Sequence, residues 1–224
     1  GGTVSSAGGS YLGVASGATG TATVDGPGSR WISSGSLGIG SQGGGTMTIR
    51  NGAAVSNVFG SLAIQAGSTG TVAVDGAGST WTNSADLHVG YGGIGALTVS
   101  NGGSVSASTM FIAYQPGSVG KLNIGAAVGQ AATAPGTLSA ASVDLGSGNG
   151  EIVFNHTGSN YTFAPVITGS GAGTRSVRVE AGTTILTAAS PYTGPTIIDG
   201  GTLLVNGSIA GSAVTVNALG TLGG

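Results

Sequence analysis

The sequence predicts an all-β fold, a single-stranded parallel β-helix (a solenoid) in which each coil stacks on the one before it. Three observations support this prediction: a regular 25-residue repeat, apolar residues that alternate with polar ones inside each repeat, and a scarcity of charge. The chain has 224 residues, including 48 Gly, and only five Lys+Arg and seven Asp+Glu. A chain so rich in Gly is expected to be disordered unless a period organises it.

The 25-residue repeat is marked by one glycine in each coil. After each of the five glycines named next, apolar residues alternate with mostly polar ones over four positions, as a strand with one buried face requires. The glycines recur at a constant spacing: Gly20, Gly45, Gly70, Gly95 and Gly120. Self-similarity at such a spacing is typical of solenoids. We expect two inward columns: Ala22, Met47, Val72, Leu97 and Leu122, and Val24, Ile49, Val74, Val99 and Ile124.

A second strand is predicted in each coil by the same rule. Its first inward column would be Leu12, Leu37, Leu62, Leu87 and Ile112. Its second would be Val14, Ile39, Ile64, Val89 and Tyr114. The residues between the two columns would face outward: Gly13, Gly38, Ala63, His88 and Ala113.

The sequence also has a longer period of 50 residues, equal to two coils, because residues 20–70 align with residues 70–120 without a gap. Coils therefore alternate between an Asp-Gly type with a tryptophan and an Asn-Gly type. We interpret the repeated polar, glycine and tryptophan positions as structural turn and corner residues: Asp25, Gly26, Trp31, Asn51, Gly52, Asp75, Gly76, Trp81, Asn101 and Gly102. In such turns an aspartate typically bonds its own backbone.

The two tryptophans allow two readings. Exposed rings at a regular repeat could stack on sugars. Alternatively, Trp31 and Trp81 fold over a corner and close the tube, which we favour.

Three segments are expected along the chain. Residues 1–125 form regular coils, and residues 126–137 form an Ala-rich loop or insertion with room for one helical turn before Pro135. Residues 138–224 continue the β-helix less regularly, with a 19-residue period marked by Gly182, Gly201 and Gly220. The inward residues expected there are Ile185, Leu203, Val205, Val214, Val216 and Leu222. Because residues 1–19 resemble the second half of a double coil, we expect the chain to be a fragment of a longer protein.

Charge and chemistry exclude several functions. Five cations cannot neutralise a run of phosphates, so no nucleic-acid or lipid-surface partner is expected. The acids are dispersed, and we expect His88 and His156 to lie apart on the surface. No cysteine, nucleotide-binding motif or calcium repeat is present in the sequence. We therefore expect no catalytic residues, no metal site and no cofactor.

Residues 192–208 (YTGPTIIDGGTLLVNGS) closely resemble the autotransporter-associated β-strand repeat. Residues 70–81 and 96–106 are similar to the Thr/Gly-rich repeats of the same bacterial passenger domains. The resemblance implies a right-handed β-helix on the surface of a Gram-negative bacterium, with a translocator barrel expected downstream. It also implies a stalk or adhesin role in adhesion, aggregation or biofilm formation. The partners would then be host surface proteins or glycans, or passengers on neighbouring cells.

Two alternatives remain open at this point. The first is a β-helix that binds or cleaves polysaccharide, which would need carboxylates gathered on one face. The second is an ice-binding solenoid, because Thr21 and Thr23 repeat as Thr46 and Thr48. That array is interrupted in later coils by Ala73, Ala96, Lys121 and Asn123.

Overall fold

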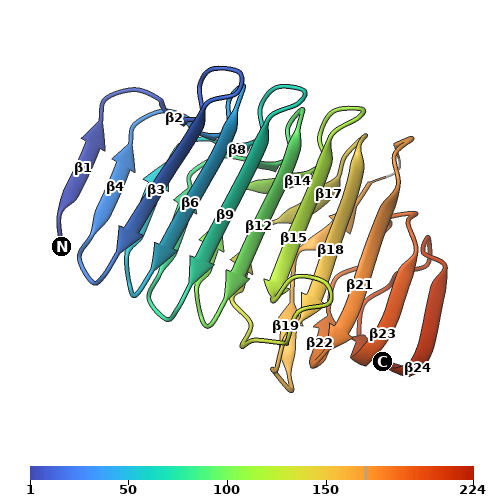
Figure 1. Ribbon diagram of the computed structural model, residues 1–224. Helices are drawn as coiled ribbons and strands as arrows, with labels where there is room; N and C mark the ends of the chain where they lie inside the picture. The colour runs from blue at the N-terminus through green and yellow to red at the C-terminus, as the bar shows by residue number, and fades with distance from the viewer. Residues whose placement is uncertain (170) are drawn as a thin grey trace.

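The computed structural model describes residues 1–169 and 171–224, which form a rod with the N-terminus at one end and the last strand at the other (Figure 1). The described residues contain 24 strands and no helix. The strands belong to three sheets that run along the rod.

The three sheets take their strands in turn from successive coils. The six-stranded sheet contains β1 (Thr3–Ser6), β4 (Arg30–Ser33), β7 (Ala54–Asn57), β10 (Thr80–Asn83), β13 (Ser104–Ser106) and β16 (Thr137–Ser139). The seven-stranded sheet contains β2 (Ser10–Leu12), β5 (Leu37–Ile39), β8 (Gly60–Leu62), β11 (Leu87–Val89), β14 (Thr109–Ile112), β17 (Ser142–Leu145) and β20 (Val166–Thr168). The eleven-stranded sheet contains β3 (Thr19–Asp25), β6 (Gly44–Arg50), β9 (Thr69–Asp75), β12 (Ile94–Ser100), β15 (Val119–Gly125), β18 (Asn149–Asn155), β19 (Tyr161–Phe163), β21 (Arg175–Ala181), β22 (Thr183–Leu186), β23 (Thr196–Val205) and β24 (Val214–Gly223).

Strands that follow one another in sequence up to β18 lie in different sheets, and each pairs in parallel with the corresponding strand of the coils before and after it. For example, β9 lies between β6 and β12, and both pairings are parallel. This arrangement is a parallel β-helix, so the predicted fold class is confirmed.

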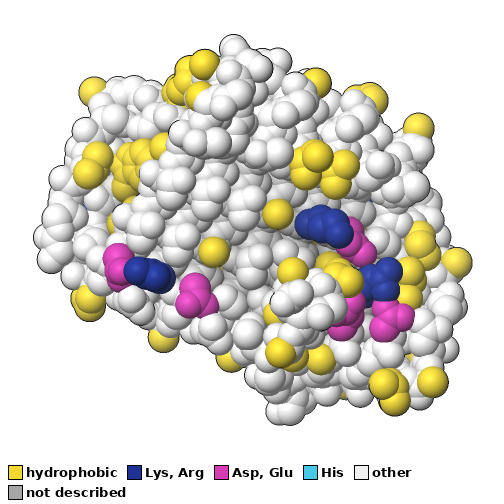
Figure 2. All heavy atoms as spheres, in the orientation of Figure 1, with side chains coloured by type: hydrophobic (Ala, Val, Ile, Leu, Met, Phe, Trp, Pro, Cys, Tyr) yellow, Lys and Arg dark blue, Asp and Glu magenta, His cyan; other side chains and the backbone are white. Residues whose placement is uncertain are grey.

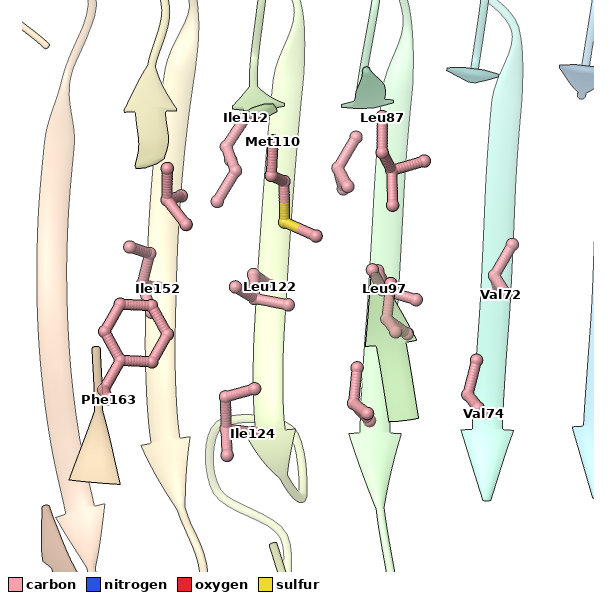
Figure 3. Packing of buried hydrophobic residues seen from close by; sticks show 14 of the residues in the cluster. Val72, Val74, Leu87, Leu97, Met110, Ile112, Leu122, Ile124, Ile152 and Phe163 are labelled. Atoms are coloured by element: carbon pink, nitrogen blue, oxygen red, sulfur yellow. The ribbon is translucent and has the colours of Figure 1, made fainter. Parts of the chain in front are cut away.

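The inward columns predicted for the long strands are confirmed. In the eleven-stranded sheet Met47 pairs with Val72, Val72 with Leu97 and Leu97 with Leu122. These side chains are buried, and Figure 3 shows Val72, Leu97 and Leu122 following one another inside the tube. Strict alternation along each long strand produces this result because every second side chain points to the same face.

The prediction for the seven-stranded sheet was wrong in its phase. Leu12 pairs with Ile39 and Leu37 pairs with Gly60, so Leu12 and Leu37 stand in different columns. One column contains Leu12, Ile39, Leu62, Val89 and Ile112; the other contains Ser10, Leu37, Gly60, Leu87 and Met110. The step between partners is not constant, because the long step from Ser10 to Leu37 is followed by the shorter step from Leu37 to Gly60.

The bend that ends each of these strands follows the same alternating step. The bend residue has a positive φ in every coil: Gly13 (61°), Gly40 (78°), Ala63 (55°), Gly90 (78°) and Ala113 (56°). Because Ala63 and Ala113 bend the chain directly after Leu62 and Ile112, Ile64 and Tyr114 come after the bend and do not enter the interior. Ala63 and Ala113 are buried bend residues rather than members of an outward column.

Residues 126–137 contain no helical turn, contrary to the expectation for that segment. The segment is instead held by bridges of Thr133 with His156 and of Ser100 with Pro135. The N–H of Gly129 also donates to Glu180 Oε2 at 2.9 Å. The loop is thereby attached to the flank of the rod.

In the last coils Thr183 pairs with Thr202, and Thr202 pairs with Thr221. Leu203 is buried as expected, but Ile185 is not an inward residue, because Thr184 and Leu186 on either side of it are the buried ones. The inward positions of β24 are partly exposed, since no coil stacks on that strand. No helix capable of crossing a membrane occurs in the described part of the chain.

Candidate functional surfaces

The repeated aspartates connect coils rather than capping their own turns. Asp25 Oδ2 accepts hydrogen bonds from Arg50 Nε at 3.0 Å and Nη2 at 2.8 Å, and its Oδ1 accepts one from Asn51 Nδ2 at 2.7 Å. Two coils on, Asp75 Oδ1 accepts from Ser100 Oγ and Asn101 Nδ2, both at 2.7 Å. The expectation that each aspartate bonds its own backbone was therefore wrong.

The reason is that Asp25 and Asp75 are the last residues of β3 and β9, not the first residues of a turn. A side chain at a strand end stands beside its partner on the next coil, where opposite charges or a donor and an acceptor attract. Hydrogen bonds from Asn51 and Arg50 lower the pKa of the exposed Asp25 carboxyl. The carboxylate is held in its charged form.

The Asn-Gly turns adopt the conformation that favours these two residue types. Asn51 has a φ of 56° and Gly52 a φ of 80°, and Asn101 and Gly102 repeat the pair at 51° and 80°. Two successive residues with positive φ are the arrangement for which Asn followed by Gly is preferred. In the alternate coils the aspartate does not have a positive φ; the positive values occur at two glycines two residues apart, Gly26 and Gly28 or Gly76 and Gly78. The two coil types therefore differ in turn geometry.

The tryptophans lie within strands β4 and β10, not at corners. Trp81 is fully buried, and its Nε1 donates to Asn57 Oδ1 at 2.7 Å. Trp31, one double coil earlier, is half-buried and packs against the same core. The corner placement was therefore wrong, and Trp81 has no free face on which a sugar could stack.

Beside Trp81 the interior contains a polar column. Asn57 Nδ2 donates to Asn83 Oδ1 at 2.7 Å, and Asn83 Nδ2 donates to the Ser106 carbonyl at 3.2 Å. Both asparagines are buried. Because every side-chain polar group named here has a partner, the column avoids the cost of unpaired polar groups in an apolar interior.

The histidines are not the exposed, isolated residues that were expected. His156 is fully buried; its Nε2 lies 2.9 Å from Thr184 Oγ1, and its Nδ1 accepts from the N–H of Gly158 at 3.2 Å. Burial lowers the pKa of His156, so the neutral ring is favoured. His88 is half-buried, and burial lowers its pKa too, while nearby Asp86 opposes that change.

His88 belongs to a cluster of four rings on the outer face of the seven-stranded sheet, which we call the aromatic patch: His88, Tyr91, Phe111 and Tyr114. His88 and Phe111, paired across β11 and β14, lie 5.0 Å apart with planes 12° from parallel. The rings of Tyr91 and Tyr114 are 5.1 Å apart at 27°. The two pairs meet nearly at right angles, at 71° between His88 and Tyr91 and 78° between Phe111 and Tyr114.

On the face shown in Figure 2, the charged side chains form two groups over the eleven-stranded sheet. One contains the Asp25–Arg50 pair. The other crosses four coils: Lys121 Nζ is 3.0 Å from Glu151 Oε2, Arg178 Nε is 3.2 Å from Glu151 Oε1, and Arg178 Nη1 contacts Asp199. Alternating signs along this ladder join neighbouring strands without stacking like charges.

Arg175 is a buried cation held by backbone oxygens. Its guanidinium donates to the carbonyls of Leu145 at 2.7 Å, Gly146 at 2.6 Å, Gly171 at 2.6 Å and Gly173 at 2.9 Å. These four bonds join two glycine-rich turns on adjacent coils. The role is structural, because the donors are directed at the protein's own backbone.

None of these groups forms a recognisable reaction centre. In residues 1–169 and 171–224, no three His, Cys, Asp or Glu side chains come together as metal ligands would. The carboxylates of Asp25, Glu151 and Asp199 are occupied by cations or amides. The described surface therefore consists of ladders that bond one coil to the next, with one aromatic patch.

Sequence reasoning considered tryptophan as the exposed aromatic and missed the aromatic patch. A signal was available, because the same positions one double coil earlier contain small or aliphatic residues: Gly38, Ser41, Ser61 and Ile64. A comparison of the two double coils position by position would have revealed the substitution of four rings at once.

The architecture and surface define a class: a parallel β-helix whose coils are joined by polar and ionic ladders. Residues 180–205 match the family described as the passenger-associated transport repeat. A stretch of 91 residues is 38% identical to the adhesin BmaC autotransporter of Brucella suis biovar 1 (strain 1330), covering 40% of this chain and 3% of that protein. A stretch of 112 residues is 36% identical to the uncharacterized lipoprotein YdeK of Escherichia coli (strain K12), covering 45% of this chain and 8% of that protein.

The resemblance inferred from the sequence is confirmed: residues 180–205 match a passenger-associated transport repeat, and part of the chain is similar to an autotransporter adhesin. It spans only a small part of the length of both curated relatives. No solved structure matches it.

Proposed function

We propose that this chain is a non-catalytic, surface-displayed segment of a passenger domain that supports adhesion, aggregation or biofilm formation by a Gram-negative bacterium. The observation that carries the proposal is the combination of a passenger repeat at residues 180–205 with 38% identity to an autotransporter adhesin over 91 residues. The rod geometry supports it, because stacked coils extend a protein along one axis and present a long outer surface.

The outer surface is suited to display in solvent. Half of the chain's twelve charged side chains form ion pairs between neighbouring coils, and its turns are polar and rich in glycine. Because each strand bonds to the coil on either side, interior strands of the rod present no free edge to other proteins. The proposed partners are host surface molecules or the passengers of neighbouring cells.

The test uses the full-length protein displayed on a Gram-negative host. Residues 20–119, two complete double coils, are deleted so that the remaining strands keep their phase. We expect antibodies against the segment to label intact cells, and we expect the deletion to reduce adhesion or cell aggregation at equal surface abundance. Labelling that requires permeabilised cells would overturn the localisation, and unchanged adhesion and aggregation would overturn the function.

Catalysis is tested separately on the purified chain. Asp25→Asn and Asp75→Asn remove the repeated carboxylates, and polysaccharide turnover is measured beside the parent protein. We expect no turnover in any of the three proteins. Turnover by the parent that is lost in either variant would make this segment an enzyme.

A further inference from the structure

We propose that the aromatic patch is a binding site for a neutral glycan, with the rings of Tyr91, Phe111 and Tyr114 receiving the apolar faces of sugar residues. This inference rests on the proposed function, since it names the class of ligand through which the segment would adhere. The starting observation is that the fold does not require these rings.

The preceding double coil demonstrates this point. One 50-residue period before the patch, the same backbone positions contain Gly38, Ser41, Ser61 and Ile64, yet the strands pair in the same way. The rings lie on the outer face, whereas the interior of these coils is filled by residues such as Leu87 and Met110. The equivalent positions of the preceding double coil contain no ring, so the cluster of four aromatic side chains adds a feature that the pairing of the strands does not require.

The geometry leaves ring surface available. His88 and Phe111 form one nearly parallel pair and Tyr91 and Tyr114 another, and the two pairs stand nearly perpendicular. Tyr114 is 40% exposed and the other three rings are half-buried. Packing of each ring against two or three others limits its motion, so binding orders few side-chain rotations.

Polar groups suited to hydroxyl groups surround the rings. Gln115 is exposed and follows Tyr114, and its backbone N–H donates to the Tyr91 carbonyl at 3.0 Å. Asp144 pairs with Phe111 in the sheet, and its Oδ2 accepts from Thr168 Oγ1 at 2.7 Å. The rings supply apolar contact area, and the amide and carboxylate beside them can hydrogen-bond to sugar hydroxyl groups.

The charges around the aromatic patch favour a neutral sugar over an acidic one. All five cations lie in the six-stranded and eleven-stranded sheets: Arg30, Arg50, Lys121, Arg175 and Arg178. The acidic neighbours of the patch are Asp86, whose Oδ1 accepts from the N–H of Thr109 at 3.2 Å, and Asp144. A uronate or a sialic acid would be repelled by these carboxylates without a cation to receive it.

Size argues against a second copy of the chain. A stable protein interface buries roughly 800 Å² on each partner. Four partly exposed aromatic side chains, each of about 150 to 250 Å² in full, offer well under half of that area. The patch matches one or two sugar residues better than a protein surface.

The experiment is calorimetric titration of the 224-residue chain with three neutral probes, namely cellotetraose, maltotetraose and α-(1→4)-linked galactotetraose, and with the acidic counterpart of the last, tetragalacturonate. We expect at least one neutral probe to bind and tetragalacturonate not to bind. Tyr114→Ala and Phe111→Ala should each weaken binding by about tenfold, since each removes a stacking surface. Tyr114→Phe keeps the ring and should bind within about twofold of the parent.

Two controls separate binding from folding. Tyr11→Ala removes an exposed ring on the same sheet outside the patch and should leave binding unchanged. The combined variant His88→Gly, Tyr91→Ser, Phe111→Ser and Tyr114→Ile copies the preceding double coil, so it should fold and should not bind. Circular dichroism verifies the fold of each variant.

Several results would overturn the proposal: no binding of any neutral probe, equal binding of tetragalacturonate, or retained binding in the combined variant. Sedimentation is measured in parallel, and self-association that disappears in the combined variant would replace the glycan with a second copy of the chain. If cells still adhere while no neutral probe binds, the glycan proposal alone fails. If the deletion leaves adhesion unchanged while the titrations succeed, the proposed function alone fails.

Discussion

Replacing Asn57 with alanine tests the buried polar column at its centre. Asn57 accepts from Trp81 Nε1 and donates to Asn83 Oδ1, both at 2.7 Å, inside the tube. The substitution leaves a buried indole N–H and a buried amide oxygen without these partners. Each unpaired group costs about 1 to 3 kcal/mol, so we expect a loss of roughly 2 to 6 kcal/mol in the free energy of unfolding.

The assay is urea unfolding followed by tryptophan fluorescence. The chain has two tryptophans, so a Trp31→Phe background makes the emission report on Trp81 alone. Asn160→Ala, at an exposed position, is the matched control and should change stability by less than about 0.5 kcal/mol. A double-mutant cycle with Trp81→Phe is followed by circular dichroism instead, because the Trp31→Phe, Trp81→Phe protein contains no tryptophan. Trp81→Phe should recover part of the loss, because it removes the stranded donor. An Asn57→Ala protein that unfolds at the urea concentration of the control would refute the reasoning.

Three further predictions concern single residues. Gly60→Ala should destabilise the chain by about 1 to 3 kcal/mol in the same urea assay, because an added Cβ would lie 2.3 Å from Asn83 Oδ1 and 3.0 Å from Trp81 Cζ2, whereas Gly8→Ala meets no atom within 4 Å. Burial lowers the pKa of His156, so below about pH 6.5 the unfolded chain binds a proton that the folded chain does not. As the pH decreases, the free energy of unfolding should therefore decrease by up to about 1.4 kcal/mol per pH unit until the folded pKa is reached. A profile from pH 7.5 to 5 that is the same in His156→Asn would contradict this. Arg175→Met should lower the thermal midpoint by several degrees, because four backbone carbonyls lose their donors; an unchanged midpoint by scanning calorimetry would contradict the structural role of the guanidinium.

The long strands could be predicted from the sequence, because the alternation of apolar and polar residues within each strand is enough to determine which side chains face inward. In the long strands, Ala22 and Val24 and their counterparts in the following coils face inward, as the pairing of β3 with β6 verifies. Four successive alternating positions leave only one face for the apolar side chains. No knowledge of the rest of the coil was needed.

The short strands could not be placed in this way because their phase depends on where the chain bends. Leu62 and Ile64 alternate as well as Leu37 and Ile39 do, but the bend at Ala63 separates the first pair. A positive φ in alanine is unfavourable in isolation and persists only because the surrounding coil imposes it. Composition therefore gave no indication of that bend, and the regular 25-residue spacing of leucines concealed the alternating step.

The polar residues could be recognised as important, but their partners could not be named. The sequence identifies Asp25 and Asn51 as repeated positions, yet their hydrogen bond joins residues on adjacent coils, which only the pairing register brings together. The aromatic patch was missed for a related reason. His88 and Phe111 belong to different coils and become neighbours only through the short step of the seven-stranded sheet.

A final prediction concerns the distribution of stability along the rod. In a solenoid, each coil is stabilised mainly by its own interior and by its neighbours, so local differences in packing persist as local differences in protection. Residues 150–215 bury Phe154, Phe163 and Tyr192 completely, whereas the fully buried apolar side chains of residues 20–70 are no larger than methionine and Trp31 is only half-buried. A buried aromatic side chain removes about 150 to 250 Å² from water, which at about 25 cal/mol per Å² exceeds the contribution of a valine by one or more kcal/mol.

We therefore expect amides in residues 150–215 to exchange more slowly with solvent than amides in residues 20–70, measured by hydrogen exchange on the intact chain at neutral pH. The coil around Trp81 is an internal control, because it lies outside both ranges and also buries a large ring. It should be protected more strongly than residues 20–70 if side-chain size is the cause. Equal protection of the two ranges would contradict unequal packing as a source of stability. Protection of residues 150–215 without protection around Trp81 would attribute the difference to position along the rod instead, because side-chain size would then fail to predict it.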